Sequence, residues 1–412
     1  MKNADRDLDV IVWGASGFTG RLVAEFIVER YGASRELRWG IGGRSLAKLE
    51  EVRRSLAAID PAAAELPLIV GDASDRASLG AVVTRARVVL STVGPYAIHG
   101  RELVAACVAH GTDYCDLTGE VPFIRDMIDA HHAGAVASGA RIVCCCGFDS
   151  IPSDLGVLML QRYATEKYGA PCSEVRFYVM KAKGGVSGGT IASMMNLMES
   201  AGRDPRVRKL AFDAYALTPG ERGPDGADQQ TARYDAGLAQ WTGPFVMAAI
   251  NTRVVRRSNA LLGYAWGRNF SYAEVMATGA GAAGWLRATA TSVGTGAAMA
   301  LAAIAPTRDV LKMALPSPGE GPSKQARERG SFEVKLVGLC DGRRLVGTVA
   351  GKGDPGYAAT ARMIAESAVC LAKDELPPGG GVLTPASCMG DALIARLRAA
   401  GMRFDVTEDA GA

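Results

Sequence analysis

The chain has 412 residues, of which 48% are hydrophobic and 22% are charged, and its formal net charge is +3. This length allows two or three domains with substantial cores, whereas the small net charge and the lack of long basic runs argue against a nucleic-acid partner. The N-terminus has no apolar segment typical of a secretory signal, so we expect a cytoplasmic protein. The nine cysteines form no CxxC pair, which predicts reduced thiols and no metal site.

The first predicted element is a strand, a glycine-rich turn and a helix. Residues 10–13 form a short apolar run, and apolar residues recur at helical spacing over residues 21–31. The three glycines between them follow the spacing GxxGxxG. Glycine lets such a turn close tightly, lets backbone approach a pyrophosphate and lets the helix pack on the strand, while the helix N-terminus faces the anion. We therefore expect a dinucleotide to contact Gly14, Ser16, Gly17, Phe18, Thr19 and Gly20.

The end of the second predicted strand, residues 37–41, indicates which dinucleotide binds. An enzyme that prefers NAD usually has an acidic residue here for the ribose 2′-hydroxyl, whereas a 2′-phosphate calls for cations and hydroxyl groups. The sequence has Arg44, Ser45 and Lys48 at this point and no acidic residue before Glu50. We therefore expect NADP(H) as the cofactor, held in part by these three side chains.

Strands and helices continue to alternate as far as residue 147. We expect strands at 66–70, 88–92, 113–116 and 141–145, and helices at 46–57, 76–86, 101–110 and 121–138. This alternation predicts an α/β domain with a doubly wound parallel sheet of the Rossmann type, whose ligands lie at the carboxyl ends of the strands. On this rule Asp72 borders the adenine, and Gly94, Pro95 and Tyr96 line the nicotinamide side.

The pattern changes after residue 147. A helix to residue 166, strands at 174–183 and 270–277, a helix at 191–202 and a hairpin of 332–340 with 343–351 around Asp341-Gly342 predict an α+β domain. We expect a Rossmann domain over residues 1–147, this second domain over 148–354 and C-terminal helices within 355–412 that fold back on the first domain. Glycine- and proline-rich stretches at 218–226 and 316–322 are the expected linkers.

The segment 288–305 contains no charged residue, but alanine, glycine and threonine dominate it. Its length is close to that of a membrane span, although its hydrophobicity is weak. We expect a buried or substrate-facing helix within residues 279–305. Peripheral membrane contact and a homodimer are left open.

Several motifs along most of the chain resemble those of the saccharopine dehydrogenase-like oxidoreductases, and within them the trans-acting enoyl reductases of lipid biosynthesis. The most specific are, in this order, YCDLTGE, GFDSIPSDLG and GGVSGGT. The resemblance implies an NADPH-dependent reductase of an enoyl double bond on an acyl thioester or lipid-like intermediate, acting in trans with a polyketide synthase. The alternatives are a saccharopine-type imine or amino-acid oxidoreductase, which would need cationic clamps for carboxylates, and a non-catalytic NADP-binding scaffold.

Reduction of an enoyl thioester needs a proton donor late in the reaction, and tyrosine, histidine or water can serve. All four histidines precede residue 133, so the second domain supplies none. We expect Tyr96 as the catalytic donor and His99 as the second choice. Ser150, Tyr163 and Lys167 match the Ser and YxxxK spacing of short-chain dehydrogenases, but their helix follows the domain change, so we do not assign them this role.

The loop 183–190 is rich in glycine and hydroxyl residues and precedes a helix. It could present backbone donors to a substrate carbonyl, or it could form a sharp connection between a strand and a helix. Asp149 closes the last strand of the first predicted domain. The expected substrate contacts are Asp149, Ser187, Gly188 and Thr190.

Overall fold

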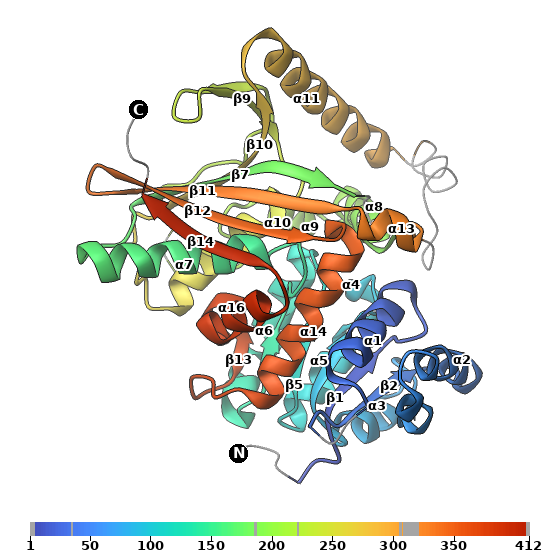
Figure 1. Ribbon diagram of the computed structural model, residues 1–412. Coiled ribbons are helices and arrows are strands. Elements are labelled where there is room, and N and C mark those ends of the chain that lie inside the picture. Colours follow the sequence, from blue (N-terminus) through green and yellow to red (C-terminus); the bar gives the residue numbers. More distant parts are fainter. Residues whose placement is uncertain are drawn as a thin grey trace.

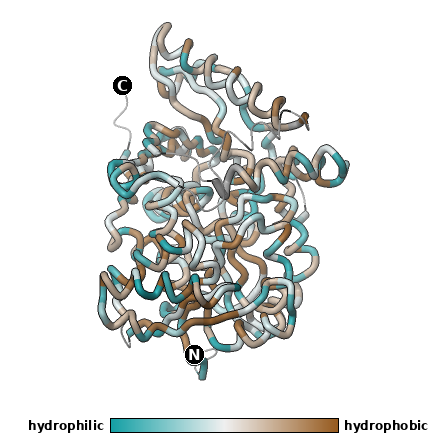
Figure 2. Tube along the Cα trace, turned by 90° about the vertical axis from the view of Figure 1, so that its right-hand side faces the viewer, coloured by the Kyte–Doolittle hydropathy of each residue, from teal (hydrophilic) through white to brown (hydrophobic). Residues whose placement is uncertain are grey.

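The computed structural model describes residues 5–33, 36–184, 188–220, 222–304, 307 and 321–408. Within them, two seven-stranded sheets lie one above the other, with sheet A in the lower half of Figure 1 and sheet B in the upper half. Figure 2 shows hydrophobic residues gathered along the inner chain segments and hydrophilic residues along the outer helices. A pocket described below is lined by residues of both halves.

Sheet A is entirely parallel, with the strand order β13-β6-β5-β4-β1-β2-β3. The order reverses between β1 and β4, and ligands of doubly wound sheets bind at such a switch point. The predicted Rossmann-type sheet is thus confirmed. Its strands are β1 (Leu8–Trp13), β2 (Trp39–Gly43), β3 (Leu68–Val70), β4 (Ala86–Ser91), β5 (Asp113–Asp116), β6 (Arg141–Val143) and β13 (Gly381–Leu383).

Helices cover both faces of sheet A, because side chains along a strand alternate between faces and the central strands are apolar on both. In β1, Val10 and Val12 pack in one core cluster with α1, α2 and α14, whereas Ile11 packs in the other with α3, α5 and α6. These helices are α1 (Phe18–Tyr31), α2 (Leu46–Ala57), α3 (Arg76–Val83), α5 (Arg101–Ala109), α6 (Val121–Ser138) and α14 (Thr360–Lys373).

Sheet B is mixed, with the strand order β14-β12-β11-β7-β10-β9-β8. Only β7 and β10 pair in parallel, and the other neighbours are antiparallel. This confirms the predicted second, α+β part of the fold. Its strands are β7 (Glu174–Lys183), β8 (Arg233–Asp235), β9 (Gln240–Pro244), β10 (Ser271–Gly279), β11 (Ser331–Cys340), β12 (Arg343–Lys352) and β14 (Arg403–Glu408).

The hairpin predicted around Asp341-Gly342 is present. Cys340 pairs with Arg343 across the turn, and the two turn residues have φ values of 47° and 80°. Aspartate and glycine tolerate this left-handed region, and the turn therefore matches the twist of the flanking strands.

The C-terminal part of the chain completes both sheets. β13 pairs with β6 at the edge of sheet A, and β14 pairs with β12 at the edge of sheet B. α14 packs across β1, β4 and β5 beside α1, as Figure 1 shows, whereas α16 packs against α14, α7 and β14. The remaining helices are α4 (Tyr96–His99), α7 (Ile151–Tyr168), α8 (Gly188–Arg203), α9 (Pro205–Phe212), α10 (Ala248–Leu261), α11 (Gly281–Ala303), α13 (Lys324–Glu328), α15 (Pro385–Cys388) and α16 (Gly390–Ala399), with short turns η1 (Pro61–Glu65) and η2 (Pro355–Ala359).

The uncharged segment expected to be a buried helix is a helix, α11, but much of it is exposed. Leu286 and Val293 are 59% and 65% exposed, and Figure 1 shows α11 extending away from the body of the molecule. Of the two alternatives expected, a buried or a substrate-facing helix, full burial is wrong, because apolar composition does not show whether a covering element exists. One residue of α11, Met299, lines a pocket described below. In the described part of the chain, no helix is long and apolar enough to cross a membrane.

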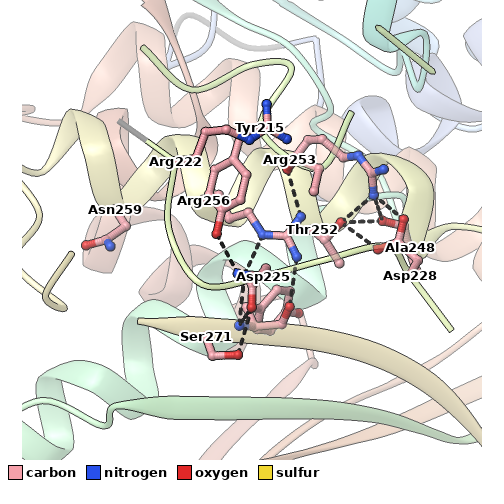
Figure 3. Close-up of polar contacts among 12 residues, drawn as sticks. Tyr215, Arg222, Asp225, Asp228, Ala248, Thr252, Arg253, Arg256, Asn259 and Ser271 are labelled. Atoms are coloured by element: carbon pink, nitrogen blue, oxygen red, sulfur yellow. Dashed lines mark hydrogen bonds and ion pairs between the residues drawn. The ribbon is translucent and has the colours of Figure 1, made fainter. Parts of the chain in front are cut away.

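Helix α10, which the sequence analysis did not predict, is buried although it carries three arginines. Figure 3 shows how the loop that precedes β8 neutralises two of them: Arg253 forms an ion pair with Asp228, and Arg256 Nε lies 2.6 Å from Asp225 Oδ2. Asp225 also accepts a hydrogen bond from Ser271 Oγ at 2.7 Å. Because buried charges are tolerated only when paired, these contacts hold the loop, α10 and β10 together.

This cluster generates a stability prediction. Asp225→Ala would leave the Arg256 guanidinium buried without its carboxylate, since the two side chains are only 6% and 5% exposed. We expect the free energy of unfolding to fall by about 3–5 kcal/mol, as for other broken buried pairs. The measurement is urea denaturation followed by circular dichroism.

The matched control is Arg203→Ala, which removes an exposed pair with Glu199 and should cost no more than about 1 kcal/mol. Equal losses in the two variants would contradict a stabilising role for the buried cluster.

Candidate functional site

A cavity of about 970 Å³, here called the nucleotide cavity, opens at the carboxyl ends of β1, β2 and β4. This is the switch point of sheet A, where the order of the strands reverses. The structure brings together here most of the residues expected to bind the cofactor, namely Gly14, Ser16, Gly17, Phe18, Thr19, Gly20, Arg44, Lys48, Asp72 and Gly94.

The glycines of the turn are required by close backbone contacts. Gly14 has a φ of 89°, and a Cβ at Gly20 would lie 2.2 Å from the carbonyl oxygen of Gly14. Only that same oxygen, at 3.3 Å, lies near a Cβ built at Gly17. Gly17 is also the N-cap of α1 and offers no side-chain oxygen, so the first-turn N–H groups of the helix stay available to an anion. The turn therefore fits a pyrophosphate.

The adenosine end of the nucleotide cavity carries exposed cations. Arg44 and Lys48 line it, whereas Ser45 does not, because its hydroxyl caps α2 by accepting a hydrogen bond from the N–H of Lys48 at 3.5 Å. Asp72 accepts hydrogen bonds from the backbone N–H and the hydroxyl of Ser74, at 2.9 and 2.7 Å. These bonds, and then Arg44, lower the pKa of Asp72.

At the nicotinamide end, the structure separates the two expected proton donors. The Tyr96 hydroxyl donates to the carbonyl oxygen of Ser91 and accepts from the N–H of Leu117, both at 3.2 Å. Burial is the main cause that raises the pKa of Tyr96 well above its ordinary value. His99 is exposed and lines the nucleotide cavity, whereas Pro95 does not line it. The Tyr96 hydroxyl is thus bound to backbone groups on both sides.

Glu120 organises the same loop. Its carboxylate accepts hydrogen bonds from the N–H groups of Tyr96 and Ala97, at 2.8 and 2.9 Å, and so caps the short helix α4. It also accepts a hydrogen bond from Ser193 Oγ of α8 at 2.7 Å. Glu120 therefore ties the nicotinamide loop to a helix of the second half of the chain.

A second pocket, of about 200 Å³ and here called the apolar pocket, adjoins the nucleotide cavity and shares Thr19, Thr92 and Gly94 with it. Its wall is formed mainly by apolar side chains of four helices that follow residue 187. These are Met194, Leu197 and Met198 of α8, Ala211 of α9, Ala249 and Ile250 of α10, and Met299 of α11. Among the described residues that line it, none is lysine, arginine or histidine.

Asp149 also lines the apolar pocket, as the analysis of the sequence anticipated for a substrate contact. It follows β6 and precedes α7, and burial raises the pKa of its carboxyl to about 7. In the described part of the chain, its carboxyl group has no hydrogen-bond partner. Asp149 is therefore a carboxyl group held in an apolar wall without a counter-charge.

The other expected substrate contacts are located only in part. Gly188 and Thr190 lie in the first turn of α8, and Ser187 lies outside the described residues. The residues of the short-chain dehydrogenase pattern do not form a site: Lys167 Nζ donates to the Tyr163 hydroxyl at 3.1 Å and pairs with Glu408 on an exposed surface. Ser150 is buried and donates to Asn251 Oδ1 at 3.1 Å.

Several residues of the site escaped the sequence analysis. Tyr357 lines the nucleotide cavity from η2, and its ring packs edge-on against Phe18 at 4.9 Å. Ser193 and the methionines of α8 were assigned to a helix but to no pocket. The recurrence of Met194 and Met198 four residues apart was a usable signal, because such residues share one helix face.

Comparisons with known proteins agree with this geometry. Residues 10–143 match the family described as the saccharopine dehydrogenase NADP-binding domain. Trans-acting enoyl reductases of Mycobacterium tuberculosis and Mycobacterium ulcerans are 42% and 40% identical to this chain, each over 99% of both sequences.

Among solved structures, apo saccharopine dehydrogenase (L-Glu forming) of Saccharomyces cerevisiae covers 98% of this chain and is itself covered completely, with a TM-score of 0.55 at 14% identity. This structural similarity supports the fold alone, whereas the sequence identity to the full-length relatives shows the family. The chain belongs to the saccharopine dehydrogenase-like oxidoreductases and, among them, to the trans-acting enoyl reductases.

Proposed function

We propose that this protein is an NADPH-dependent reductase of the enoyl double bond of an acyl thioester, acting in trans on an intermediate carried by a polyketide synthase. The observation that carries the proposal is the junction of the nucleotide cavity with the apolar pocket at Thr19, Thr92 and Gly94. A substrate in the apolar pocket would lie next to the nicotinamide end of the cofactor. The names of the full-length relatives support the same activity.

The residues present fit the proposed cofactor. The first-turn N–H groups of α1 suit the pyrophosphate, Arg44 and Lys48 suit a 2′-phosphate, and the Gly94 loop suits the nicotinamide. When bound, NADPH supplies a hydride to the β-carbon of the substrate. The protein contributes binding, orientation and a dry environment for that step.

The apolar pocket also favours an uncharged substrate over an amino acid. A saccharopine-type substrate carries carboxylates and would need cations, but the described lining has none. Its volume of about 200 Å³ is below the range of roughly 300–1,000 Å³ usual for drug-sized ligands. The pocket therefore suits the reacting end of an acyl chain whose remainder extends outward past Val246, which is 40% exposed.

The direct test of the proposal is oxidation of NADPH, followed by absorbance. We expect turnover with a medium-chain 2-enoyl thioester and none with a 2-oxo acid plus an amine, because only the former lacks a carboxylate to be buried. The reverse preference would support the imine-reducing alternative. Binding of NADPH without turnover of either substrate would support the scaffold alternative.

A narrower apolar pocket should discriminate between chain lengths. Ala211→Trp places a large ring in the wall of the pocket. We expect kcat/KM to fall roughly tenfold or more for a long-chain enoyl thioester and much less for a crotonyl thioester, since each displaced methylene is worth about 1–3 kcal/mol. The control is Ala137→Trp on the exposed side of α6. Equal losses for both chain lengths would argue against this pocket as the acyl site.

The cofactor preference should depend on Arg44. Arg44→Asp removes a cation from the adenosine end and places a carboxylate where an NAD enzyme has one. A charge-assisted hydrogen bond is worth about 1.5–3 kcal/mol, so the preference for NADPH over NADH should fall at least tenfold in fluorescence titrations. Arg54→Asp, an equal charge change outside the cavity on α2, the helix that follows Arg44, should leave the preference unchanged. Equal affinity of the unmodified protein for both cofactors would contradict the assignment.

A further inference from the structure

We propose that Asp149, rather than Tyr96 or His99, donates the proton that completes the reduction. This inference rests on the proposed function and names a catalytic residue for it. Asp149 lines the apolar pocket, which shares Gly94 with the nucleotide cavity, and its carboxyl is close enough to the Tyr96 hydroxyl to contribute to the raised pKa of that group.

The hydrogen bonds of the neighbouring groups leave Asp149 as the free acid of the pocket. The Tyr96 hydroxyl already donates to the Ser91 carbonyl, and using its proton would break that buried bond. Glu120 accepts three hydrogen bonds, from Tyr96, Ala97 and Ser193, so both of its carboxyl oxygens are already engaged as acceptors. No such donor to Asp149 exists within the described residues. Its proton is thus uncommitted.

His99 differs from Asp149 in its position. It lines the nucleotide cavity but not the apolar pocket, and its side chain is exposed. A proton donor there would lie in the cavity proposed for the cofactor and not in the pocket proposed for the acyl chain. Water reaches an exposed imidazole more readily than it reaches a carboxyl group in an apolar wall.

The charges around Asp149 favour its protonated form. The titratable side chains that share the lining are Tyr96 and Glu120, and the buried thiol of Cys145 and the carboxyl of Asp116 lie behind them. The described lining from α8 to α11, and that from residues 355–360, contains no titratable side chain. Without a cation to stabilise its carboxylate, burial raises the pKa of Asp149 to about 7. A substantial share of the molecules therefore carries the proton at neutral pH.

The proposed step is balanced in atoms and charge. Hydride addition to the β-carbon moves the π electrons of the double bond onto the α-carbon and the thioester carbonyl, which gives an enolate. The Asp149 O–H bond then breaks, its proton forms the new C–H bond at the α-carbon, and the enolate negative charge passes to the Asp149 carboxylate. Water from the solvent returns a proton to that carboxylate after the product leaves.

The test compares Asp149→Asn with Tyr96→Phe, His99→Ala and a matched control, Asp154→Asn. Asp154 is fully buried, whereas Asp149 is partly exposed, but burial raises the pKa of both carboxyl groups to about 7. Outside the pocket, Asp154 accepts hydrogen bonds from the Ser258 hydroxyl and the N–H of Ala386. Turnover is measured against pH, the α-carbon configuration is measured after reaction in D₂O, and NADPH affinity is measured by fluorescence.

For the unmodified protein we expect turnover to decline as the pH rises above about 7, because the acid must be protonated, and deuterium to enter one face of the α-carbon. Asp149→Asn should lower turnover by roughly 10²-fold or more, remove the pH-dependent decline and mix the two α-deuterated configurations, with NADPH affinity unchanged. Asp149→Glu should restore part of the turnover and the pH dependence. Asp154→Asn should keep both the decline of turnover above pH 7 and the single configuration at the deuterated α-carbon.

The thermal stability of the variants gives a second test, which does not depend on turnover. An acid with a folded-state pKa above its unfolded value lowers stability as the pH rises from about 4 to 7. We therefore compare the melting temperature of Asp149→Asn with that of the unmodified protein at two pH values. The increase caused by the substitution should be larger at pH 8 than at pH 5.

The inference is overturned if Asp149→Asn still shows the decline of turnover above pH 7 and a single configuration at the deuterated α-carbon. It is also overturned if Tyr96→Phe or His99→Ala abolishes that decline and that single configuration instead. If the unmodified protein turns over no enoyl thioester, the proposed function fails and this inference fails with it.

Discussion

The relation between the two sheets depends on polar groups buried along α10. Arg257 donates to the carbonyl oxygen of Val382 in sheet A at 2.6 Å, and Asn251 Nδ2 donates to Glu274 in sheet B at 2.8 Å. Each of these groups would be costly to bury without its partner, so the two sheets are held in one relative position. Ile250 of the same helix lines the apolar pocket. The shape of that pocket is therefore a consequence of hydrogen bonds made elsewhere on α10.

Under the proposed function, the two cavities would divide the recognition of cofactor and substrate between different kinds of groups. The nucleotide cavity uses backbone N–H groups, a glycine turn and exposed cations, all supplied by consecutive elements of sheet A. The apolar pocket uses side chains from α8 to α11, which belong to the second half of the chain. The first arrangement suits any dinucleotide reductase of this fold, whereas under the proposed function the second would determine which substrate reaches the nicotinamide.

Prediction from sequence succeeded where the cause of the structure is local. The glycine turn, the cations after β2 and the Asp341-Gly342 hairpin depend on neighbouring residues, so their patterns could be read directly. The burial of α10 depends on Asp225 and Asp228, which lie in or just after a glycine- and proline-rich stretch that indicates only a linker. An arginine-rich segment such as α10 in turn indicates a solvated face. Likewise, the sequence does not show that the Tyr96 hydroxyl is hydrogen-bonded to two backbone groups, or that the Asp149 carboxyl has no hydrogen-bond partner among the described residues. Both facts depend on residues that meet only in the folded protein.

Strand β13 forms the edge of sheet A and helix α14 covers one of its faces, although both come late in the chain. This order has a consequence for synthesis of the protein on the ribosome. The sheet is complete only when residue 383 has emerged, although its first six strands are made by residue 143. Until then, the apolar face of β1, β4 and β5 that α14 covers stays open, and β6 presents an unpaired edge to other chains. A nascent or truncated chain that ends between residues 143 and 360 thus exposes both an apolar face and a strand edge, which are the features that favour aggregation.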